Sequence, residues 1–308
     1  MRAAVIGLGS MGQGAALSLL RAGIDTAGCD IRPEAAASLA DAGGRTAATP
    51  AQAAAGADVV FVYVMNAAQS DAVLFGDDGA VAAAAPGTVF LLCATMPPAD
   101  AERLGARLAE AGMLAIDAPV SGGSVRAASG QITVMASGPA AAFDRAGPAL
   151  DAVAARVFRL GERPGDGSRM KMINQLLAGV HIAAAAEAMV LAASQRMDLA
   201  QVLEVISTCA GTSWMFENRG PHIVAGDWTP HSAVDIFVKD LGIVTGAANA
   251  AGCPVPLSQA ALDLFRAASD AGMGRLDDAA VARVLAARAG VALPGDAGSG
   301  GTGSGDAG

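Results

Sequence analysis

A lysine stands in an apolar stretch of this sequence. Lys171 lies in GDGSRMKMINQLL, between Met170 and Met172, where a helix would bury its apolar face. A neutral lysine amine can take the proton of a substrate hydroxyl, and removal from water disfavours the charged ammonium. The apolar neighbours of Lys171 are residues that would exclude water. The stretch therefore predicts a proton-transfer residue, against the alternative of a lysine that extends from the first turn of an exposed helix into solvent.

Two amides accompany this lysine. Asn174 and Gln175 follow Lys171 by three and four positions, so the three side chains share one face of a helix. That face would present one amine and two amides, each able to bind a hydroxyl or a carboxylate. The arrangement favours catalysis over a solvated lysine, and it predicts substrate contacts for Asn174 and Gln175.

A second segment could bind an anion. The residues PVSGG, 119–123, are predicted to follow a strand, and open α/β sheets bind ligands beyond the carboxyl ends of their strands. The glycines expose backbone N–H groups and Ser121 adds a hydroxyl, which suits a small carboxylate. The residues alone leave an ordinary turn equally open.

The N-terminal residues AAVIGLGSMGQG contain the pattern GxGxxG, directly after a predicted strand and at the start of a predicted helix. In a dinucleotide site the first glycine permits a tight turn, the second lets the backbone approach a pyrophosphate, and the third lets the helix pack on the strand. An ordinary strand–turn–helix is the alternative. The predicted cofactor contacts of this turn are Gly7, Leu8, Gly9, Ser10, Met11 and Gly12.

A carboxylate follows at the spacing that such a site needs. Asp30 ends the next predicted strand, eighteen residues after Gly12. A carboxylate there accepts hydrogen bonds from the adenosine ribose and repels a 2′-phosphate, which favours NAD over NADP. Arg32 could instead accept a phosphate, but we interpret it as a solvated loop residue.

The elements that would position these groups alternate in type. Predicted strands and alanine-rich helices alternate up to about residue 163, and several strands are apolar on both faces, which predicts a doubly wound parallel sheet. The strands are AAVIG, DTAGCD, VVFVYV, TVFLLCA, LAIDAPV, ITVMASG and ARVFRLG. The helices that follow are 168–194, 198–210, 213–225, 233–251, 257–271 and 277–289. We therefore predict an N-terminal Rossmann domain at 1–163, an all-α substrate and oligomerisation domain at 164–291, and a disordered tail at 292–308.

The composition bounds the class of protein. Of 308 residues, 53% are hydrophobic and 16% charged, so burial between subunits is expected as well as burial within one. The net charge of −9 argues against nucleic-acid binding, and no run of about 18 bulky apolar residues predicts a membrane span. The start of the chain lacks a signal-peptide pattern, and three histidines without ligand spacing predict no metal. The cysteines look like small core residues in a reducing cytoplasm: Cys29, Cys93, Cys209 and Cys253.

Three motifs, together with the glycine-rich turn, make a family resemblance specific. They are DAPVSGG (117–123), GDGSRMKMINQ (165–175) and KDL (239–241). The set resembles the β-hydroxyacid dehydrogenase family from Ala3 to about residue 290. The stretches LLAGVHIAAAAEAM and SWMFENRGPHIVAGDWTPHSAVDIFVKDLG carry a narrower likeness within that family, to members that act on L-threonate.

The resemblance implies a role at each matching position. Lys171 is implied as the catalytic residue, Thr95 as a cofactor contact, and Lys239 as a residue that reaches the nicotinamide end of the cofactor. The family commonly has K-x-x-N-N where this chain has Lys171, Asn174 and Gln175. The residues implied to hold the substrate are Ser121, Gly122, Gly123, Asn174 and Gln175.

The resemblance also implies an activity. The expected reaction is NAD-dependent oxidation of a small hydroxy acid in the cytoplasm, first of all L-threonate at C2 to 2-oxo-tetronate. Alternatives are a dehydrogenase of 3-hydroxyisobutyrate, a reductase of tartronate or succinate semialdehyde, and, from another class, a dinucleotide-sensing protein without chemistry. The long helix that begins near Ser168, about 40 Å at 1.5 Å per residue, is expected to help form a homodimer or homotetramer.

Three further residues carry hypotheses only. His181, Trp214 and Asn218 could help to form a polar pocket for a polyol acid. For His181, a core histidine with one hydrogen-bond partner is the more usual explanation.

Overall fold

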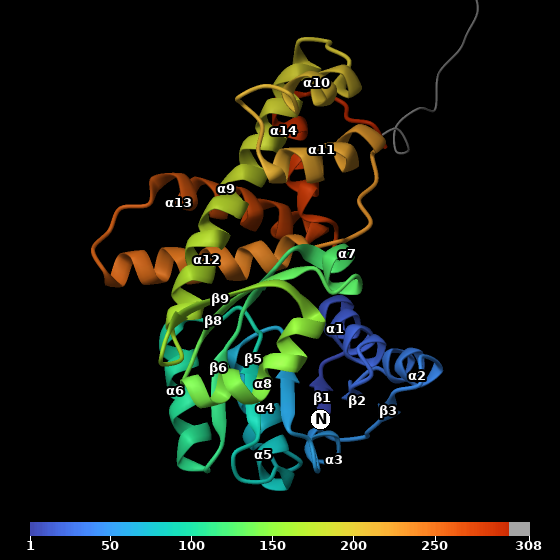
Figure 1. The fold of residues 1–308 in the computed structure, drawn as a ribbon. Helices are drawn as coiled ribbons and strands as arrows, with labels where there is room; N and C mark the ends of the chain where they lie inside the picture. Colours follow the sequence, from blue (N-terminus) through green and yellow to red (C-terminus); the bar gives the residue numbers. More distant parts are fainter. Residues whose placement is uncertain (296–308) are drawn as a thin grey trace, which may run out of the picture. The chain divides into compact units, whose positions relative to one another are not determined.

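The computed structural model describes residues 1–295, so the part of the predicted tail from 296 on lies outside the described residues (Figure 1). The chain divides between Met172 and Ile173 into two compact units. The first unit contains the sheet and the second is helical. Within the described part of the predicted tail, Leu293 is buried in the core of the second unit.

One sheet organises the first unit. Its strands are β1 (Arg2–Ile6), β2 (Asp25–Cys29), β3 (Arg45–Thr46), β4 (Val59–Val62), β5 (Val89–Leu92), β6 (Leu114–Asp117), β7 (Val120–Ser121), β8 (Ile132–Ser137) and β9 (Ala154–Gly161). The spatial order is β3-β2-β1-β4-β5-β6-β8-β7, with β9 paired to β8. All pairs from β3 to β6 are parallel, which confirms the predicted Rossmann-like sheet. The order reverses at β1, so the crevice beyond β1 and β4 is where this type of sheet binds ligands.

The prediction of a parallel sheet is wrong at the edge that contains β7 and β8. β8 runs antiparallel to β6 and β7, and only β9 continues parallel to β8. The strands β3 and β7 were not predicted, because a two-residue strand carries no periodic signal.

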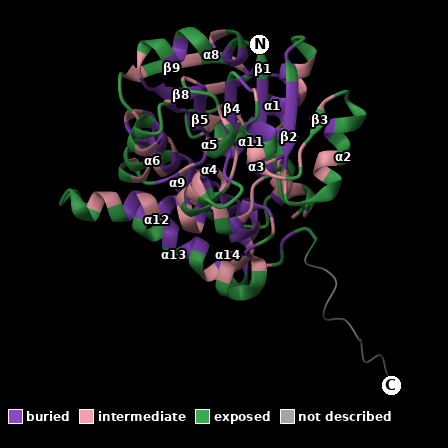
Figure 2. Cartoon of the chain, turned by 90° about the horizontal axis from the view of Figure 1, so that it is seen from below, coloured by how far each residue is buried: buried purple, intermediate pink, exposed green. Residues whose placement is uncertain are grey.

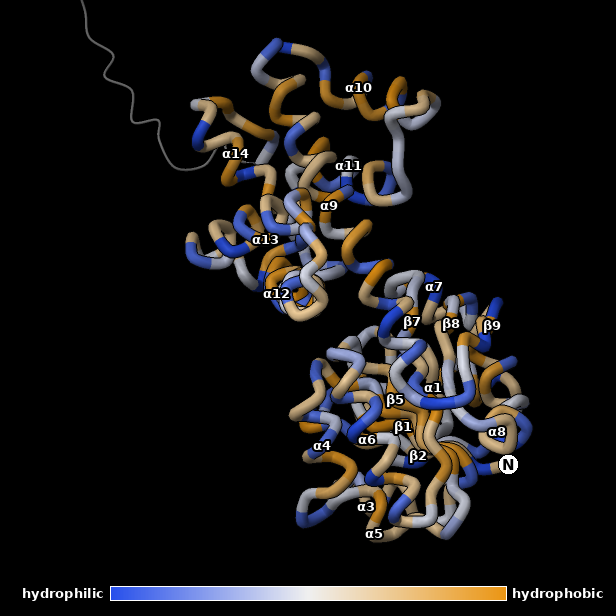
Figure 3. The backbone as a smooth tube through the Cα atoms, turned by 90° about the vertical axis from the view of Figure 1, so that its left-hand side faces the viewer, coloured by the Kyte–Doolittle hydropathy of each residue, from blue (hydrophilic) through white to orange (hydrophobic). Residues whose placement is uncertain are grey.

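Helices cover both faces of the sheet, as Figures 1 and 2 show. Successive residues of β1 alternate between two cores: Ala3 and Val5 join one, and Ala4 and Ile6 join the other. The first core receives side chains from α1 (Ser10–Arg21), α2 (Pro33–Asp41) and α8 (Ala140–Val153). The second receives them from α3 (Pro50–Ala54), α4 (Ala67–Phe75), α5 (Ala80–Ala83) and α6 (Pro98–Glu110). Apolar residues on both faces explain the strongly hydrophobic strands in Figure 3.

The second unit is a bundle of helices around a separate core. Its elements are the greater part of α9 (Asp166–Ser194), then α10 (Leu199–Ile206), α11 (Trp214–Ala225), α12 (Val234–Ala250), α13 (Pro256–Ala268), a π-helical turn (Ser269–Met273), a 3₁₀ turn (Asp278–Ala280) and α14 (Val281–Ala289). Every helix predicted after residue 167 is present within a few residues of its predicted ends. The helix ends follow local signals, such as Ser213, whose hydroxyl caps α11 by accepting from the N–H of Phe216.

The helix α9 is unusual in composition. It is the one helix among the described residues that is long and apolar enough to cross a membrane, but 44% of its most apolar window is buried inside the protein. A core helix of a soluble protein has the same length and composition. Apolar residues lie on every side of the α9 axis, so the apolar residues on one side remain exposed.

The prediction that all four cysteines are core residues is wrong for two of them. Cys29 and Cys93 are buried, whereas Cys209 and Cys253 are exposed, because both follow the ends of helices rather than strands.

A buried carboxylate ties the end of β6 to the start of α9. Asp117 accepts hydrogen bonds from the backbone N–H groups of Gly165 (2.9 Å) and Ser168 (2.7 Å) and from the Ser168 hydroxyl (2.8 Å). Asp117 is 0% exposed. Burial raises the pKa of Asp117, although the hydrogen bonds from Ser168 and Gly165 act in the opposite direction. The carboxylate thus serves as the N-terminal cap of α9.

Two glycines permit this close approach. Gly165 has φ +114°, a conformation that other residues rarely adopt. A side chain at Gly167 would place its Cβ 2.4 Å from the carbonyl oxygen of Met135 and 2.8 Å from that of Asp117. The pattern GDG is therefore required for α9 to begin directly on the strand ends.

We expect Asp117→Ala to lower the free energy of unfolding by about 2–4 kcal/mol, because two N–H groups and a hydroxyl lose their buried acceptor. Urea or thermal unfolding measures this change. The control is Asp25→Ala, which removes an exposed ion pair with Arg45 and should change stability by less than about 1 kcal/mol. Equal effects of the two substitutions would contradict a structural role for the cap.

Candidate active site

The glycines of the turn after β1 have two different structural roles. Gly7 has φ +90°, and a Cβ there would lie 2.2 Å from the Tyr63 carbonyl oxygen; a Cβ at Gly12 would lie 1.9 Å from that of Gly7. These two glycines are therefore needed for packing within the protein. At Gly9, by contrast, a Cβ would meet no protein atom nearer than a guanidinium nitrogen of Arg32 at 4.0 Å. The space beside Gly9 is open, and it fits the close approach of a dinucleotide pyrophosphate to the backbone.

The carboxylate of Asp30 faces this turn. Its Oδ2 accepts from the backbone N–H of Leu8 at 2.6 Å, and its Oδ1 accepts from the N–H of Arg32 at 2.8 Å. Burial alone would raise the pKa of Asp30, but the hydrogen bonds from Arg32 and Leu8, and the positive charge of Arg32, lower it overall. Asp30 is therefore held as an anion at the tip of β2, where a ribose diol could donate to it.

Arg32 is an exposed residue of the loop after β2, as predicted, and it also contacts Asp30. Its Nε lies 3.1 Å from Asp30 Oδ1, and its Nη2 donates to the Leu8 carbonyl oxygen at 3.2 Å, although half of the side chain is exposed. The short spacing of two residues lets the arginine fold back on the carboxylate. Arg32 thus steadies the acid rather than replacing it.

The SGG segment lies at the same end of the sheet. Ser121 ends β7, which pairs with β8 through Val120 and Val134 and through Ser121 and Thr133. Gly122 has φ +135° and Gly123 φ +73°, so both conformations favour glycine. The turn leads into α7 (Gly123–Ala128).

A further glycine joins this segment to the cofactor turn. A Cβ at Gly14, on α1, would lie 2.5 Å from the backbone of Ala127 on α7. Arg21 at the end of α1 donates to the Ala128 carbonyl oxygen at 2.7 Å. The helix that begins in the glycine-rich turn therefore supports the helix that begins in SGG, and Figure 1 shows the two side by side. Gly14 was not among the predicted site residues, although it extends the glycine pattern to GxGxxGxG.

Thr95 completes the groups of the first unit. It follows β5, which neighbours β4, and it is half-buried. The residues predicted after β1, β2, β5 and β7 all lie at the carboxyl ends of strands of one sheet. The structure brings these groups to the edge where α/β sheets bind ligands.

Lys171 is buried on α9. It is 8% exposed, and it follows Ser168, which Asp117 holds, by nearly one helical turn. The alternative of a solvated lysine therefore does not describe its position. Asn174 and Gln175 continue the same helix, as predicted.

The two amides belong to a hydrogen-bonded chain in the second unit. Asn174 Nδ2 donates to Gln175 Oε1 at 2.9 Å, and Gln175 Nε2 donates to Asp240 Oδ2 at 2.5 Å. Lys239 Nζ lies 2.6 Å from Asp240 Oδ1. Gln175 and Asp240 are 7% and 2% exposed. The family resemblance implies a cofactor contact for Lys239, whereas its ion pair with the adjacent Asp240 was not predicted.

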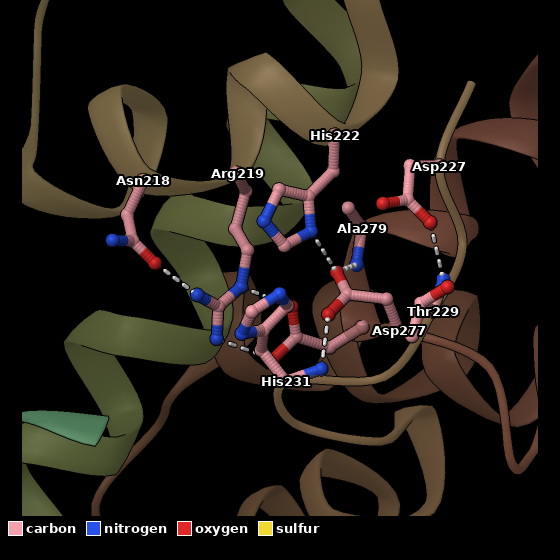
Figure 4. A network of polar contacts seen from close by, with 9 residues as sticks. Asn218, Arg219, His222, Asp227, Thr229, His231, Asp277 and Ala279 are labelled. Atoms are coloured by element: carbon pink, nitrogen blue, oxygen red, sulfur yellow. Dashed lines mark hydrogen bonds and ion pairs between the residues drawn. The ribbon is translucent and has the colours of Figure 1, made fainter. Parts of the chain in front are cut away.

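A second polar network lies between α11 and the 3₁₀ turn (Figure 4). Arg219 forms a buried ion pair with Asp278, and its guanidinium also donates to the Asn218 side chain. His222 Nδ1 lies 2.9 Å from Asp277, which also accepts from the backbone N–H of His231. Through Arg219, the Asn218 side chain is thus part of a network that holds α11 against the 3₁₀ turn.

The remaining hypotheses concern His181 and Trp214. His181 lies half-buried within α9, and Trp214 is 47% exposed at the start of α11. Their places in residues 1–295 leave both roles as hypotheses. Within residues 1–295, no group of three histidines, cysteines or carboxylates is arranged to hold a metal ion.

The comparisons with known proteins agree with this geometry. Residues 2–161 match the family model described as the NAD binding domain of 6-phosphogluconate dehydrogenase, and residues 165–285 match the NAD-binding of NADP-dependent 3-hydroxyisobutyrate dehydrogenase. L-threonate dehydrogenase of Cupriavidus necator is 55% identical over 95% of this chain and 98% of its own length. The enzyme of the same name from Escherichia coli K12 is 50% identical over 94% and 96%.

A solved structure is also similar to this chain. The crystal structure of 3-hydroxyisobutyrate dehydrogenase from Salmonella typhimurium is 50% identical, with a TM-score of 0.89 over 92% of this chain and 99% of that one. The two matched family models together cover most of both units. The chain belongs to the β-hydroxyacid dehydrogenase family of NAD-binding oxidoreductases.

Proposed function

We propose that this protein oxidises L-threonate at C2 to 2-oxo-tetronate, with NAD as hydride acceptor and Lys171 as general base. The single observation that carries the reaction is the burial of Lys171 on the helix that Asp117 caps. The choice of substrate is supported by the relatives named L-threonate dehydrogenase, which are 48–55% identical over 94–95% of this chain. The degradation of sugar acids is the corresponding metabolic role.

The chemistry needs one proton acceptor from the protein. NAD, held at the glycine-rich turn and Asp30, would supply the acceptor for the hydride that leaves C2 of the substrate. The C2 hydroxyl proton passes to the Lys171 amine, and the oxygen becomes a carbonyl. In the reverse direction the ammonium returns the proton. Because Lys171 is buried, little of the residue is accessible to solvent, which favours proton exchange with the substrate.

The substrate is proposed to be held from two segments. Ser121 and the N–H groups of Gly122 and Gly123 bind the carboxylate, because the left-handed glycine conformations turn backbone donors toward one side. Asn174 binds a hydroxyl, with Gln175 next to it. This assignment follows the family pattern at matching positions.

The cofactor is proposed to lie on residues 1–163 and the substrate domain to comprise 164–291. The open space beside Gly9 and the anionic Asp30 support the position of the pyrophosphate and of the adenosine ribose. Thr95 and Lys239 are proposed as contacts nearer the nicotinamide. The other proposed contacts are Gly7, Leu8, Ser10, Met11 and Gly12.

The similarity to 3-hydroxyisobutyrate dehydrogenase of Salmonella typhimurium favours a second candidate substrate, 3-hydroxyisobutyrate. That acid carries one hydroxyl and a methyl branch, whereas L-threonate carries three hydroxyls, so the two substrates need different pockets. Turnover of both acids, followed at the NADH absorbance band with NAD and with NADP, separates the candidates. Faster oxidation of 3-hydroxyisobutyrate than of L-threonate would contradict our proposal.

The protein is proposed to act in the cytoplasm. NAD-linked oxidation of a small acid needs the intracellular cofactor pool, and the four cysteines are free thiols. We place neither nucleic acid nor a membrane among its partners, in view of its net charge of −9.

We further propose a homodimer or homotetramer that uses the exposed side of α9. Ile173, Leu177, Ala184, Ala188 and Leu191 are all exposed and fall within about 60° of one another around the helix axis. An exposed apolar stripe of this kind marks an interaction surface.

Lys171→Ala is expected to lower kcat by about 10³-fold or more, because the general base is removed, while NADH still binds. Lys171→Arg is the matched control, since it keeps the positive charge but cannot lose its proton; it should be equally inactive. Stopped-flow absorbance measures hydride transfer, and fluorescence titration measures NADH binding. Full turnover of Lys171→Ala would refute the assignment, and NAD binding without turnover in the wild type would indicate the dinucleotide-sensing alternative.

Asp30→Ala is expected to raise KM for NAD by about 10-fold and to reduce the preference for NAD over NADP, because the ribose acceptor is lost and Arg32 is released to meet a 2′-phosphate. Arg32→Ala serves as the control, since it leaves the carboxylate in place and should keep the preference. Steady-state kinetics with both cofactors measure this. An unchanged ratio in Asp30→Ala would show that the acid does not select the cofactor.

Leu177→Glu combined with Leu191→Glu is expected to reduce the molecular mass in solution to that of a smaller species, because charge would be buried at the interface. Light scattering coupled to gel filtration, at micromolar concentration, measures this mass. Leu257→Glu on α13, where the side chain is 71% exposed, is the matched control and should change nothing. A monomeric wild type would contradict the proposed oligomer.

A further inference from the structure

The amide chain that ends at Asp240 has a fixed direction. An ionised carboxylate only accepts hydrogen bonds, so Gln175 must turn its NH₂ group toward Asp240. The Gln175 oxygen then faces the other way, and it accepts from the NH₂ group of Asn174. The charge of one buried residue therefore decides the orientation of two successive amides.

The packing of two helices brings these residues together. Gly179 follows Gln175 by one helical turn, and a Cβ there would lie 2.9 Å from the side chain of Leu241, the neighbour of Asp240. The close crossing of α9 and α12 that this glycine permits places Asp240 against Gln175. Lys239 at 2.6 Å balances the charge of Asp240.

The direction of the chain has a consequence for Asn174. One of its two amide N–H bonds is committed to Gln175, and a 180° turn of the amide would set its oxygen against the Gln175 oxygen. The Asn174 oxygen and its second N–H remain outside the chain. An oxygen acceptor beside an N–H donor matches a hydroxyl, which both donates and accepts, better than a carboxylate, which only accepts, or a methyl group.

We propose that Gln175 and Asp240 are positioning residues that fix the amide of Asn174 and thereby select acids with an additional hydroxyl over acids with a methyl group. The inference deepens the proposed function and rests on Asn174 meeting the substrate there. It differs from the common family pattern, in which an asparagine stands at the position of Gln175. The longer glutamine reaches Asp240 and acts through Asn174 instead of binding the substrate itself.

A charge exchange tests the direction of the chain. Gln175→Glu sets a second carboxylate against Asp240, and we expect kcat/KM for L-threonate to fall by about 10-fold or more. In the double variant Gln175→Glu/Asp240→Asn, the new amide donates to the new carboxylate, which still accepts from Asn174. The direction of the Asn174 amide is restored, and we expect most of the lost activity to return.

Substrate selection provides the readout that a general structural defect would not change. Asp240→Asn alone removes the fixed direction, so the ratio of kcat/KM for L-threonate to that for 3-hydroxyisobutyrate should fall by about 10-fold, mainly through KM for L-threonate. Fluorescence titration of NADH shows whether Lys239 has been disturbed, and thermal unfolding shows whether the variants are folded. Gln175→Leu, which leaves Asp240 and Lys239 intact, should lower the same ratio.

The chain offers a matched control on α13. There Gln259 Nε2 donates to Asp263 Oδ1 at 2.8 Å on the exposed surface, so Gln259→Glu and Asp263→Asn repeat the exchange without effect on catalysis. A double variant no more active than Gln175→Glu, or an unchanged substrate ratio in Asp240→Asn and Gln175→Leu, would overturn the proposal. If the wild type prefers another hydroxy acid to L-threonate, the proposed substrate fails, and the rescue is then measured on that acid and its methyl analogue.

Discussion

The hydrogen bonds of Asp117 are the constraint on which the rest of the first unit depends. One carboxylate at the end of β6 binds two backbone N–H groups and one hydroxyl at the start of α9. The position of the first turn of α9 follows from that cap, and so does the position of Lys171 within the first unit. Because the strand continues directly into the SGG segment, the same residue fixes the loop proposed to bind the carboxylate and the helix proposed to supply the base.

Glycines extend this constraint through close backbone contacts. Gly12 and Gly14 bring α1 against β1 and α7, and Gly167 brings α9 against β6 and β8. Gly179 does the same for α9 and α12 within the second unit. At each position a methyl group would meet protein atoms at 2.9 Å or less, so the distances between the proposed functional groups depend on the absence of side chains. The many alanines elsewhere serve the same dense packing with little side-chain entropy to lose.

The sequence alone predicted those features of the fold that have a local signal. Seven strands, the glycine-rich turn with Asp30, and the helices after residue 167 follow from hydrophobic runs, glycine spacing and caps. The antiparallel pairing of β8 could not be predicted, since nothing within a strand states its direction. The cap formed by Asp117, the contact of Arg32 with Asp30, and the bond from Gln175 to Asp240 were also missed. Two of these three join residues far apart in the sequence, and their geometry is decided by how helices and strands meet.

The basic residues of this chain are almost all arginines. The chain has 20 basic residues, of which only Lys171 and Lys239 are lysines, so the other 18 are arginines. Arginine forms the ion pairs of the surface, and it is also the partner of buried Asp278. An arginine at 171 could not act as a base, since guanidinium keeps its proton, and its planar group does not replace the compact ammonium at 239 that lies against Asp240. The two lysines of the chain thus stand at the positions where we propose that proton transfer and the orientation of neighbouring groups require an amine.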